Sequence, residues 1–494
     1  MWPPLPDLPP RPGRSVVAPK VSRAPSTRWT LATLSLCMLL PALATSTANV
    51  GLPAMARAFD ASFAQVQWIV LAYLVALAAV IVAAGRLGDL LGRRRLLVLG
   101  LGLFTGASLL CGVAPGLELL IAARALQGVG GATVMALTMA LVGDAPRERT
   151  GATMGIVGAA SAVGTTVGPA VGGFLIEAFG WPAIFHLNVP LGAAALALVL
   201  HAVRVDPRAA ATRQAFDIPG TLLLAFTLAA FALAGSLGDR GFTALNAGLL
   251  LGAAVGLVAF LVVETRTEEP LVRLSIFRER GLGAGLAASA LVATVMMATL
   301  VVGPFYLSVA LGLDAVATGL AMSAGPLVAA LAAAPAGRAA DRAGARRMSR
   351  VGLVGMTVGL AGLSLTPTGL GVTGYVGPIM IVTAAYALFQ AANNTQVMAA
   401  APPEQRGLVG AMLSLSRNLG LVAGASAMGA LFAFAAGAAD IGRADPAAVA
   451  HGMRVAFAVA AGLGLLALLI LAGRPAATVT AGPSAATEVE GGPS

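Results

Sequence analysis

The chain has 494 residues, of which 58% are hydrophobic and only 11% are charged. Soluble globular domains carry roughly 25% charged residues, so this composition excludes an ordinary soluble enzyme and a disordered chain. The net charge of +10 would suggest a nucleic-acid partner in a soluble protein. In a membrane protein, basic residues instead indicate which loops face the cytoplasm.

The chain opens with a Pro-rich, basic stretch at 1–28 that lacks the apolar core of a signal peptide and predicts a disordered tail. Fourteen apolar runs follow, each suited to cross a bilayer as a helix. They are 30–54, 64–86, 95–114, 117–143, 151–178, 182–204, 218–236, 246–264, 281–311, 315–337, 350–366, 375–399, 408–436 and 455–473. Residues 474–494 predict a second disordered tail. The sequence therefore predicts an all-α polytopic membrane protein with fourteen transmembrane helices.

Basic residues divide unevenly between the two sets of loops. If the N-terminus is cytoplasmic, 25 of the 31 Lys and Arg residues fall in cytoplasmic segments and 4 in outside segments. Cytoplasmic loops carry this excess in membrane proteins. We therefore expect both termini in the cytoplasm, a location in the cell membrane, and no surface for a nucleic acid.

The chain also repeats itself. Residues 85–95 (GRLGDLLGRRR) match 337–347 (GRAADRAGARR) at an offset of 252, and a second motif pair aligns Arg149 with Arg406 at an offset of 257. The repeat predicts two pseudo-symmetric six-helix bundles joined by two inserted helices, a plan typical of secondary transporters. The predicted parts are the bundle 29–204, the inserted helices and linkers 205–280, and the bundle 281–473.

Five motifs in order resemble the major facilitator superfamily, and specifically its fourteen-span drug:proton antiporter branch. They are Gly85, Asp89, Gly92, Arg93 and Arg94, repeated at Gly337, Asp341, Gly344 and Arg346; Arg124, Gln127 and Gly128 in span 4; Gly164, Gly168, Pro169, Gly172 and Gly173 in span 5; Trp181, Phe185, Asn188, Pro190 and Gly192 in span 6; and LATSTANVGLP at 43–53. The resemblance covers nearly everything between the two tails.

The resemblance implies a role for three of these motifs. Asp89, Arg93 and Asp341 would form a conformational latch, with Gly85 and Gly92 allowing a tight turn; a solvated charged loop is the alternative. Arg124 would assist proton coupling beside Gln127. Because a charge inside a span is costly, we expect Arg124 to face the cavity and be paired, or else to be a structural buried arginine.

The glycines of span 5 form a stripe on one helix face, where another span can approach closely. Pro169 removes a backbone donor, so Gly168 and Pro169 predict a hinge or gate. Generic packing of small residues is the alternative.

Polar side chains inside the spans are candidates for a substrate cavity. Tyr386, Gln390, Asn393 and Asn394 share one helix face at i, i+4, i+7 and i+8. Further candidates are Asn49, Gln67, Tyr73 and Tyr306. Each alone is also compatible with an interhelical hydrogen bond, but as a set in a mostly apolar pocket they suit a hydrophobic or amphipathic substrate.

One departure from the branch concerns proton coupling. Ala44 stands where the branch carries an Asp within the membrane, and no acidic residue lies deep in any predicted span. His186, with an ordinary pKa near 6.5, is then the preferred proton carrier, ahead of Glu118, Glu177 and Asp89; a hydrogen-bonded buried histidine is the alternative. We predict that His186→Ala abolishes proton-driven efflux.

The sequence thus predicts a multidrug efflux antiporter: a monomeric, multi-pass bacterial transporter that exports small hydrophobic or amphipathic molecules by alternating access in exchange for protons. Its partners would be the small-molecule substrate, protons and the lipid bilayer. Two alternatives stay open, namely an exporter or facilitator of one endogenous metabolite with weak or no proton coupling, and a non-transporting receptor. No cofactor or metal is expected, because the three histidines are scattered and the single lysine, Lys20, lies outside any Walker loop.

Overall fold

The computed structural model describes residues 27–143, 147–203, 217–236, 243–267, 280–401, 406–438 and 441–473, and these residues form helices and connecting turns without a strand. Within these ranges, fourteen helices are long and apolar enough to cross a membrane. The all-α polytopic fold and the predicted number of spans are therefore confirmed. The predicted tails lie almost entirely outside the described residues.

The first six spans are α1 (Thr27–Ala58), α2 (Phe63–Leu91), α3 (Arg93–Gly112), α4 (Leu117–Gly143), α5 (Arg147–Phe179) and the pair α6 (Ala183–His186) with α7 (Asn188–Ala202). The next two are α8 (Ile218–Ser236) and α9 (Ala244–Arg266). The last six are α10 (Arg280–Phe305) with the π-helix η3 (Tyr306–Ala310); α11 (Ala315–Ala343); α12 (Ala345–Leu365); η4 (Thr368–Leu370) with α13 (Gly371–Ala400); α14 (Arg406–Ala423), the π-helix η6 (Gly424–Met428) and α15 (Gly429–Ala436); and, after η7 (Ile441–Arg443), α16 (Pro446–Ala472).

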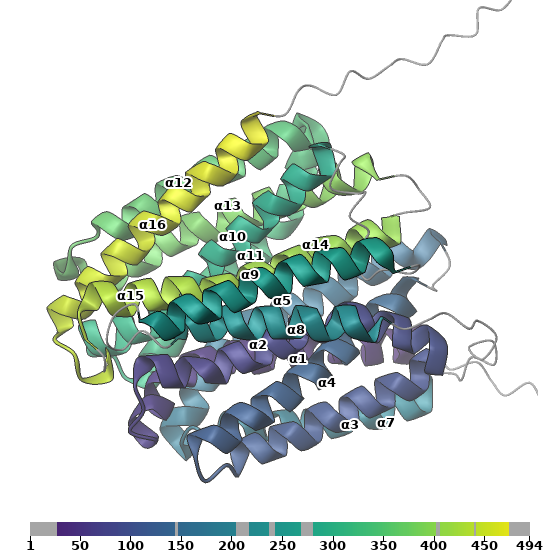
Figure 1. Cartoon of the computed structure of the whole chain (residues 1–494), viewed down its shortest axis with the longest axis horizontal. Coiled ribbons are helices and arrows are strands. Elements are labelled where there is room, and N and C mark those ends of the chain that lie inside the picture. Colours follow the sequence, from purple (N-terminus) through teal and green to yellow (C-terminus); the bar gives the residue numbers. More distant parts are fainter. Residues whose placement is uncertain are drawn as a thin grey trace, which may run out of the picture.

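The connections between spans gather at two opposite ends of the helix bundle (Figure 1). We call the end at which α1 begins and α16 finishes the terminal end, and the opposite end, with the turns at Asp60 and Arg443, the far end. The terminal end lies on the right in Figure 1.

The two repeated charged motifs are helical rather than loops, which corrects the predicted span ends. Only Gly92 separates α2 from α3, and only Gly344 separates α11 from α12. Both glycines have positive φ, 93° and 87°, a conformation that residues with a Cβ rarely adopt. Charge lowers the hydropathy there, but a single glycine suffices to reverse the chain. Gly85 lies inside α2 and makes no turn.

The two halves use the same packing devices. Glycines bring α5 against α1, where a Cβ on Gly164 or Gly168 would lie closer than 3 Å to atoms of α1. In the C-terminal half, Gly420 of α14 and Gly424 of η6 allow the same close approach to α10, because a Cβ on either would lie closer than 3 Å to its backbone.

A second shared device is an arginine that caps the last helix of each half. Arg94 of α3 donates to the carbonyl of Leu200 near the end of α7 at 2.8 Å. Arg350 of α12 donates to the carbonyls of Leu471 and Ala472 at the end of α16, both at 3.3 Å. Cations stabilise helix C-termini in this way.

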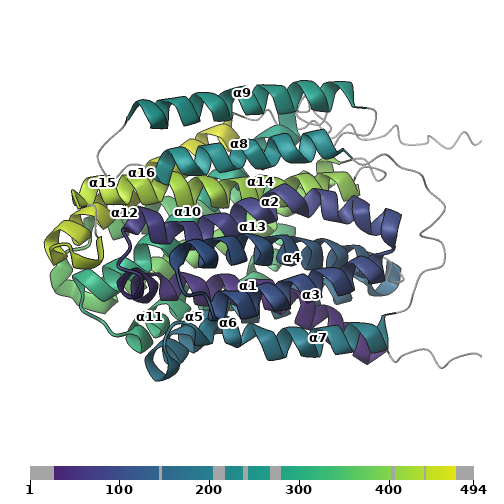
Figure 2. The same cartoon turned by 60° about the horizontal axis from the view of Figure 1, so that its bottom comes forward.

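The two inserted helices form a hairpin on one side of the bundle. α8 packs against α2 and η6, while α9 forms an outer layer on α8 (Figure 2). Leu251, Val255 and Val258 of α9 are each at least 60% exposed, as expected for side chains that face lipid.

Candidate functional site

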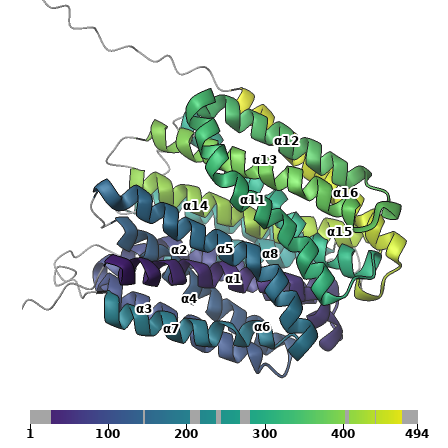
Figure 3. The same ribbon diagram turned by 180° about the vertical axis from the view of Figure 1, so that it is seen from behind.

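The two halves pack closely at the far end through α5 and α11. A Cβ on Gly173 would collide with the carbonyl of Ala315, and a Cβ on Gly319 would collide with that of Pro169. Both contacts lie near the far ends of their helices, and α11 crosses α5 there and diverges from it toward the terminal end (Figure 3). The predicted gate residues Gly168 and Pro169 therefore lie beside a backbone contact between the halves, with Gly168 facing Ser46 of α1.

Aromatic rings and an ion pair close the same end. The Phe63 ring of α2 lies 4.9 Å from that of Phe305 and 5.4 Å from that of Phe432 between centroids, both edge-on. Arg443 pairs with Asp60 at 2.6 Å, but both side chains are more than 70% exposed. Such a pair contributes about 0–1 kcal/mol, so the far end is closed mainly by apolar and backbone packing.

Gln67, predicted to line a cavity, instead joins the two halves. Its side chain is buried and donates a hydrogen bond to the carbonyl of Ala425 in η6. Ser426 of the same π-helix donates to the carbonyl of Ala232 in α8 at 3.2 Å. π-helical turns widen the backbone and concentrate at functional sites. The sequence analysis missed η6, because no residue pattern marked this interruption of the span.

Arg124 is enclosed inside the N-terminal half, which agrees with the alternative of a buried arginine bonded to the backbone, and its role in proton coupling stays a prediction. It is fully buried, its Nε donates to the carbonyl of Ile69 at 2.9 Å, and its Nη1 donates to Gln127 at 2.5 Å. The Nε2 of Gln127 in turn donates a hydrogen bond to the hydroxyl of Ser108 at 2.7 Å. The guanidinium also stacks 4.3 Å from the ring centroid of Tyr73. Arg124, Gln127 and Tyr73 thus form one polar brace, and no carboxylate of the described residues pairs with Arg124.

Two further cavity candidates are also enclosed by helices. Asn49 of α1 is fully buried. Tyr306 of η3 is fully buried, and its ring lies 5.9 Å from that of Tyr375. Neither lines the polar pocket of the C-terminal half.

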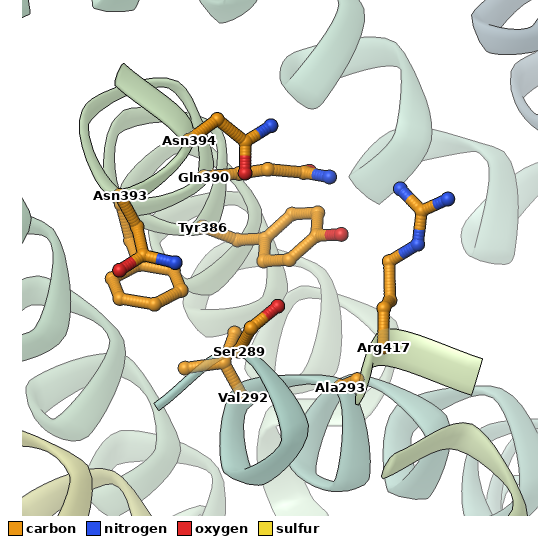
Figure 4. A pocket seen from close by; sticks show the side chains of 9 residues that line it. Ser289, Val292, Ala293, Tyr386, Gln390, Asn393, Asn394 and Arg417 are labelled. Atoms are coloured by element: carbon orange, nitrogen blue, oxygen red, sulfur yellow. The ribbon is translucent and has the colours of Figure 1, made fainter. Parts of the chain in front are cut away.

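The polar face of α13 does line a pocket. Tyr386, Gln390, Asn393 and Asn394 converge on a narrow space that α10 and α14 complete (Figure 4). The remaining lining residues are Ser289, Val292, Ala293, Phe389 and Arg417. The room between these side chains suits about one water molecule, so a larger ligand requires the walls to separate.

Hydrogen bonds between helices hold the walls of this pocket. Asn393 donates to the carbonyl of Gly285 at 3.1 Å, which joins α13 to α10. Ser416 donates to the carbonyl of Leu286 at 2.5 Å, and Thr294 to that of Gly420 at 3.1 Å, which join α14 to α10. The three helices therefore position the lining side chains as one unit.

Among the described residues, the ion pair expected of the predicted latch is present in the N-terminal half, and the latch itself stays a prediction. Asp89 accepts a hydrogen bond of 2.9 Å from Nε of Arg93 and forms an ion pair with its Nη2 at 2.9 Å, while Nη1 of Arg93 donates to the carbonyl of Ala140 near the end of α4 at 3.2 Å. In the second half Ala345 occupies the place of Arg93, so Asp341 cannot form the same pair.

His186 does not lie in the pocket. It is exposed where α6 meets α7, at the far end, and its imidazole packs against Gly112 at the end of α3. Glu118 and Glu177 are exposed near the far ends of α4 and α5. None of these three proton-carrier candidates touches the polar pocket.

Two helical halves that close at one end, with a polar pocket between spans, define a membrane transporter of the alternating-access class. Residues 34–425 and 286–490 match the family model described as Major Facilitator Superfamily. The chain belongs to this superfamily, as its motifs predicted, and it is a transporter rather than an enzyme.

Its relatives include several multidrug proteins. The chain is 32% identical to the riboflavin transporter RibZ of Clostridioides difficile, over 78% of this chain and 84% of that protein. It is 32% identical to the multidrug resistance protein Stp of Mycobacterium tuberculosis, over 78% and 72%. It is 30% identical to the multidrug efflux pump LfrA of Mycolicibacterium smegmatis, over 84% and 82%.

Solved structures share the fold at low sequence identity. A bacterial homologue of the human lysosomal transporter Spinster, inward-facing and unoccupied, superposes with a TM-score of 0.63 at 17% identity, covering 90% of this chain and 96% of that one. A D-xylose–proton symporter superposes with a TM-score of 0.66 at 15% identity, covering 90% and 97%.

Proposed function

We propose that this protein exports small hydrophobic or amphipathic molecules from the cytoplasm across the cell membrane by alternating access. The observation that carries the proposal is the tight closure of the far end through Gly173 and Gly319, together with the divergence of α5 and α11 toward the terminal end (Figure 3). A transporter closed at one end receives its substrate from the other.

The terminal end is the proposed cytoplasmic side. In the topology predicted from the sequence, the segments on the side of the N-terminus hold 25 Lys and Arg residues and the opposite segments hold 4, and positive charge favours the cytoplasm. In this orientation both termini are cytoplasmic, and the structure corresponds to the state that admits substrate from the cell. Export then requires the contact of α5 with α11 to open while the terminal ends of the halves approach each other.

Proton antiport is the proposed energy source. Every Asp and Glu whose position is described lies within two residues of a helix end. A proton site in these spans would therefore lie at a helix end, where Asp89 is held by Arg93, and not at the depth of Ala44. Ala44 is buried in an apolar cluster with Leu40, Leu97 and Leu101.

Export of one metabolite is the second candidate, and the relative that is named a riboflavin transporter favours it. The proposal is tested by efflux of a panel of amphipathic dyes and of riboflavin from cells, and by flux in proteoliposomes with and without a pH gradient. Flux of several dyes that rises with the gradient supports the polyspecific antiporter. Flux of one compound alone supports the second candidate. Binding without any flux would contradict transport and indicate a receptor.

A further inference from the structure

The pocket between α10, α13 and α14 contains a cation that none of the described acidic residues neutralises. Arg417 is half-buried on α14, and its guanidinium lies across the pocket from α13, with the hydroxyl of Tyr386 pointing toward it (Figure 4). Among the described residues, no carboxylate lies within ion-pair distance of Arg417. The other polar lining side chains, Ser289, Gln390 and Asn394, are neutral.

An arginine in this position is costly unless something satisfies it. A guanidinium has five N–H donors and no acceptor, and a charge inside a span without a partner is destabilising. The acids of the described spans lie within two residues of helix ends, so they are far from the middle of α14. The structure therefore supplies the cation and neutral donors for a negatively charged group, and leaves the anion to be supplied from outside.

The surroundings of Arg417 also select the shape of that anion. Phe389, Val292 and Ala293 provide an apolar wall beside the polar groups, which suits an aromatic or aliphatic body. The planar guanidinium fork matches the geometry of a carboxylate and can bind it with two parallel hydrogen bonds. Hydrogen bonds from Asn393, Ser416 and Thr294 join the three helices, so the polar groups are positioned together, while an aromatic body enters only when the walls separate.

We propose that Arg417 is the specificity-determining residue of a site for small amphipathic carboxylates, which bind with the carboxylate on Arg417 and the apolar body against Phe389. This inference names the substrate class for the export function proposed above, and it rests on that function only for transport, not for binding.

The test uses three probes of nearly equal size and different charge: naphthoate, naphthamide and naphthylmethylammonium. Their binding to the purified full-length protein is measured by calorimetry. We expect the wild type to bind naphthoate about tenfold or more tightly than the other two, the size expected of charge-assisted hydrogen bonds. Arg417→Gln should reduce naphthoate binding to the level of naphthamide, while Arg417→Lys should keep the preference at lower affinity.

Arg57→Gln is the matched control, because it removes an equal charge from an exposed position near the far end of α1 and should change nothing. A purely structural role for Arg417 would lower the binding of all three probes together and would overturn the proposal. So would equal binding of the three probes to the wild type, or the absence of naphthoate binding.

Counterflow of naphthoate in proteoliposomes separates this inference from the proposed function. If naphthoate binds in a way that depends on Arg417 but no compound is transported, the result supports the binding site and contradicts the export function. If amphipathic dyes are transported at rates that depend neither on their charge nor on Arg417, the result supports the export function and contradicts the binding site.

Discussion

Each half of the molecule contains an arginine in the interior of a span, Arg124 in α4 and Arg417 in α14, and the surroundings of the two residues differ. Arg124 is fully buried, bonded to Ile69 and Gln127, and stacked on Tyr73. Arg417 is half-buried at the edge of a pocket and has no acidic partner among the described residues. The first is a structural brace, and the second is available to a ligand.

The difference shows that depth in the membrane does not decide the role of a charge. The two residues differ in their surroundings: Arg124 is enclosed, with Nε and Nη1 bonded and Nη2 without a hydrogen-bond partner among the described residues, whereas Arg417 lines a pocket. The internal repeat does not relate the two residues, because at the offset of 257 Arg124 aligns with Ile381 and Arg417 with Ala160. The halves therefore share their packing glycines and capping arginines, while Arg124 and Arg417 lie on helices that the repeat does not pair.

The largest expected effect follows from removing the brace in the N-terminal half. In Arg124→Met the carbonyl of Ile69 and the side chain of Gln127 lose their donor in a buried site. Each unsatisfied buried group costs about 1–3 kcal/mol, so we expect a strong loss of thermal stability in detergent. Arg124→Lys should not restore stability, because one ammonium cannot reproduce the two directed bonds and the stacking.

Arg417→Met is the matched comparison for the brace, since it removes the same side chain from the other half. Its melting temperature should stay close to that of the wild type, or rise, because an unneutralised charge is removed. The contrast between the two arginines would be refuted if Arg124→Met melted like the wild type, or if both variants lost stability equally.

The second expected effect concerns the contact on which the two halves close. A methyl group on Gly173 would collide with the carbonyl of Ala315, so Gly173→Ala should hold α5 away from α11 at the far end. We expect flux to fall about tenfold, since a shift of 1.4 kcal/mol in the balance of facing states changes their ratio by that factor. Gly158→Ala in the same helix is the control, because its added Cβ meets no atom within 4 Å.

Cross-linking measures directly whether the far end is closed in the Gly173→Ala variant. Cysteines at positions 60 and 443, where an ion pair now joins the far-end turns, should form a disulfide readily in the wild-type background and slowly in Gly173→Ala. Equal cross-linking and equal flux in the two backgrounds would show that the α5–α11 contact does not control closure.

A smaller effect is expected where the charged motif is repeated. Asp89→Asn breaks the ion pair with Arg93 at the turn between α2 and α3, whereas Asp341→Asn removes an acid whose counterpart position is Ala345. Partly exposed pairs contribute about 0.2–1 kcal/mol, so Asp89→Asn should lower flux about two- to fivefold and Asp341→Asn should lower it less. The measurement is initial flux at matched protein amounts, and equal losses in the two variants would contradict a latch confined to the N-terminal half.

Much of the architecture was readable from sequence because it depends on local pattern. Continuous apolar runs predict the fourteen spans, and the shared face of Tyr386, Gln390, Asn393 and Asn394 follows from helical periodicity. The one-residue turns at Gly92 and Gly344 were mistaken for longer loops, since charge at a helix end lowers hydropathy as a loop does.

The rest depends on which helices meet, which no local pattern encodes. Gln67 bonds to Ala425 in the other half of the chain, and Arg124 is enclosed only because α2 packs against α4. Spans that are apolar all round carry little sign of which face is buried. For this reason the sequence placed Asn49, Gln67, Tyr73 and Tyr306 with the cavity.

The smallest expected effect concerns His186, which the sequence favoured as the proton carrier. A carrier must reach the transport pathway in at least one facing state and change its protonation between states. His186 is exposed at the far end against Gly112 of α3, apart from both the polar pocket and the α5–α11 contact. We therefore expect His186→Gln to leave flux and its dependence on the pH gradient unchanged, reversing the expectation from sequence. Flux in proteoliposomes across a series of imposed gradients is the measurement. A loss of gradient dependence with binding intact would return His186 to the coupling mechanism and would mean that protons cross the N-terminal half along its periphery.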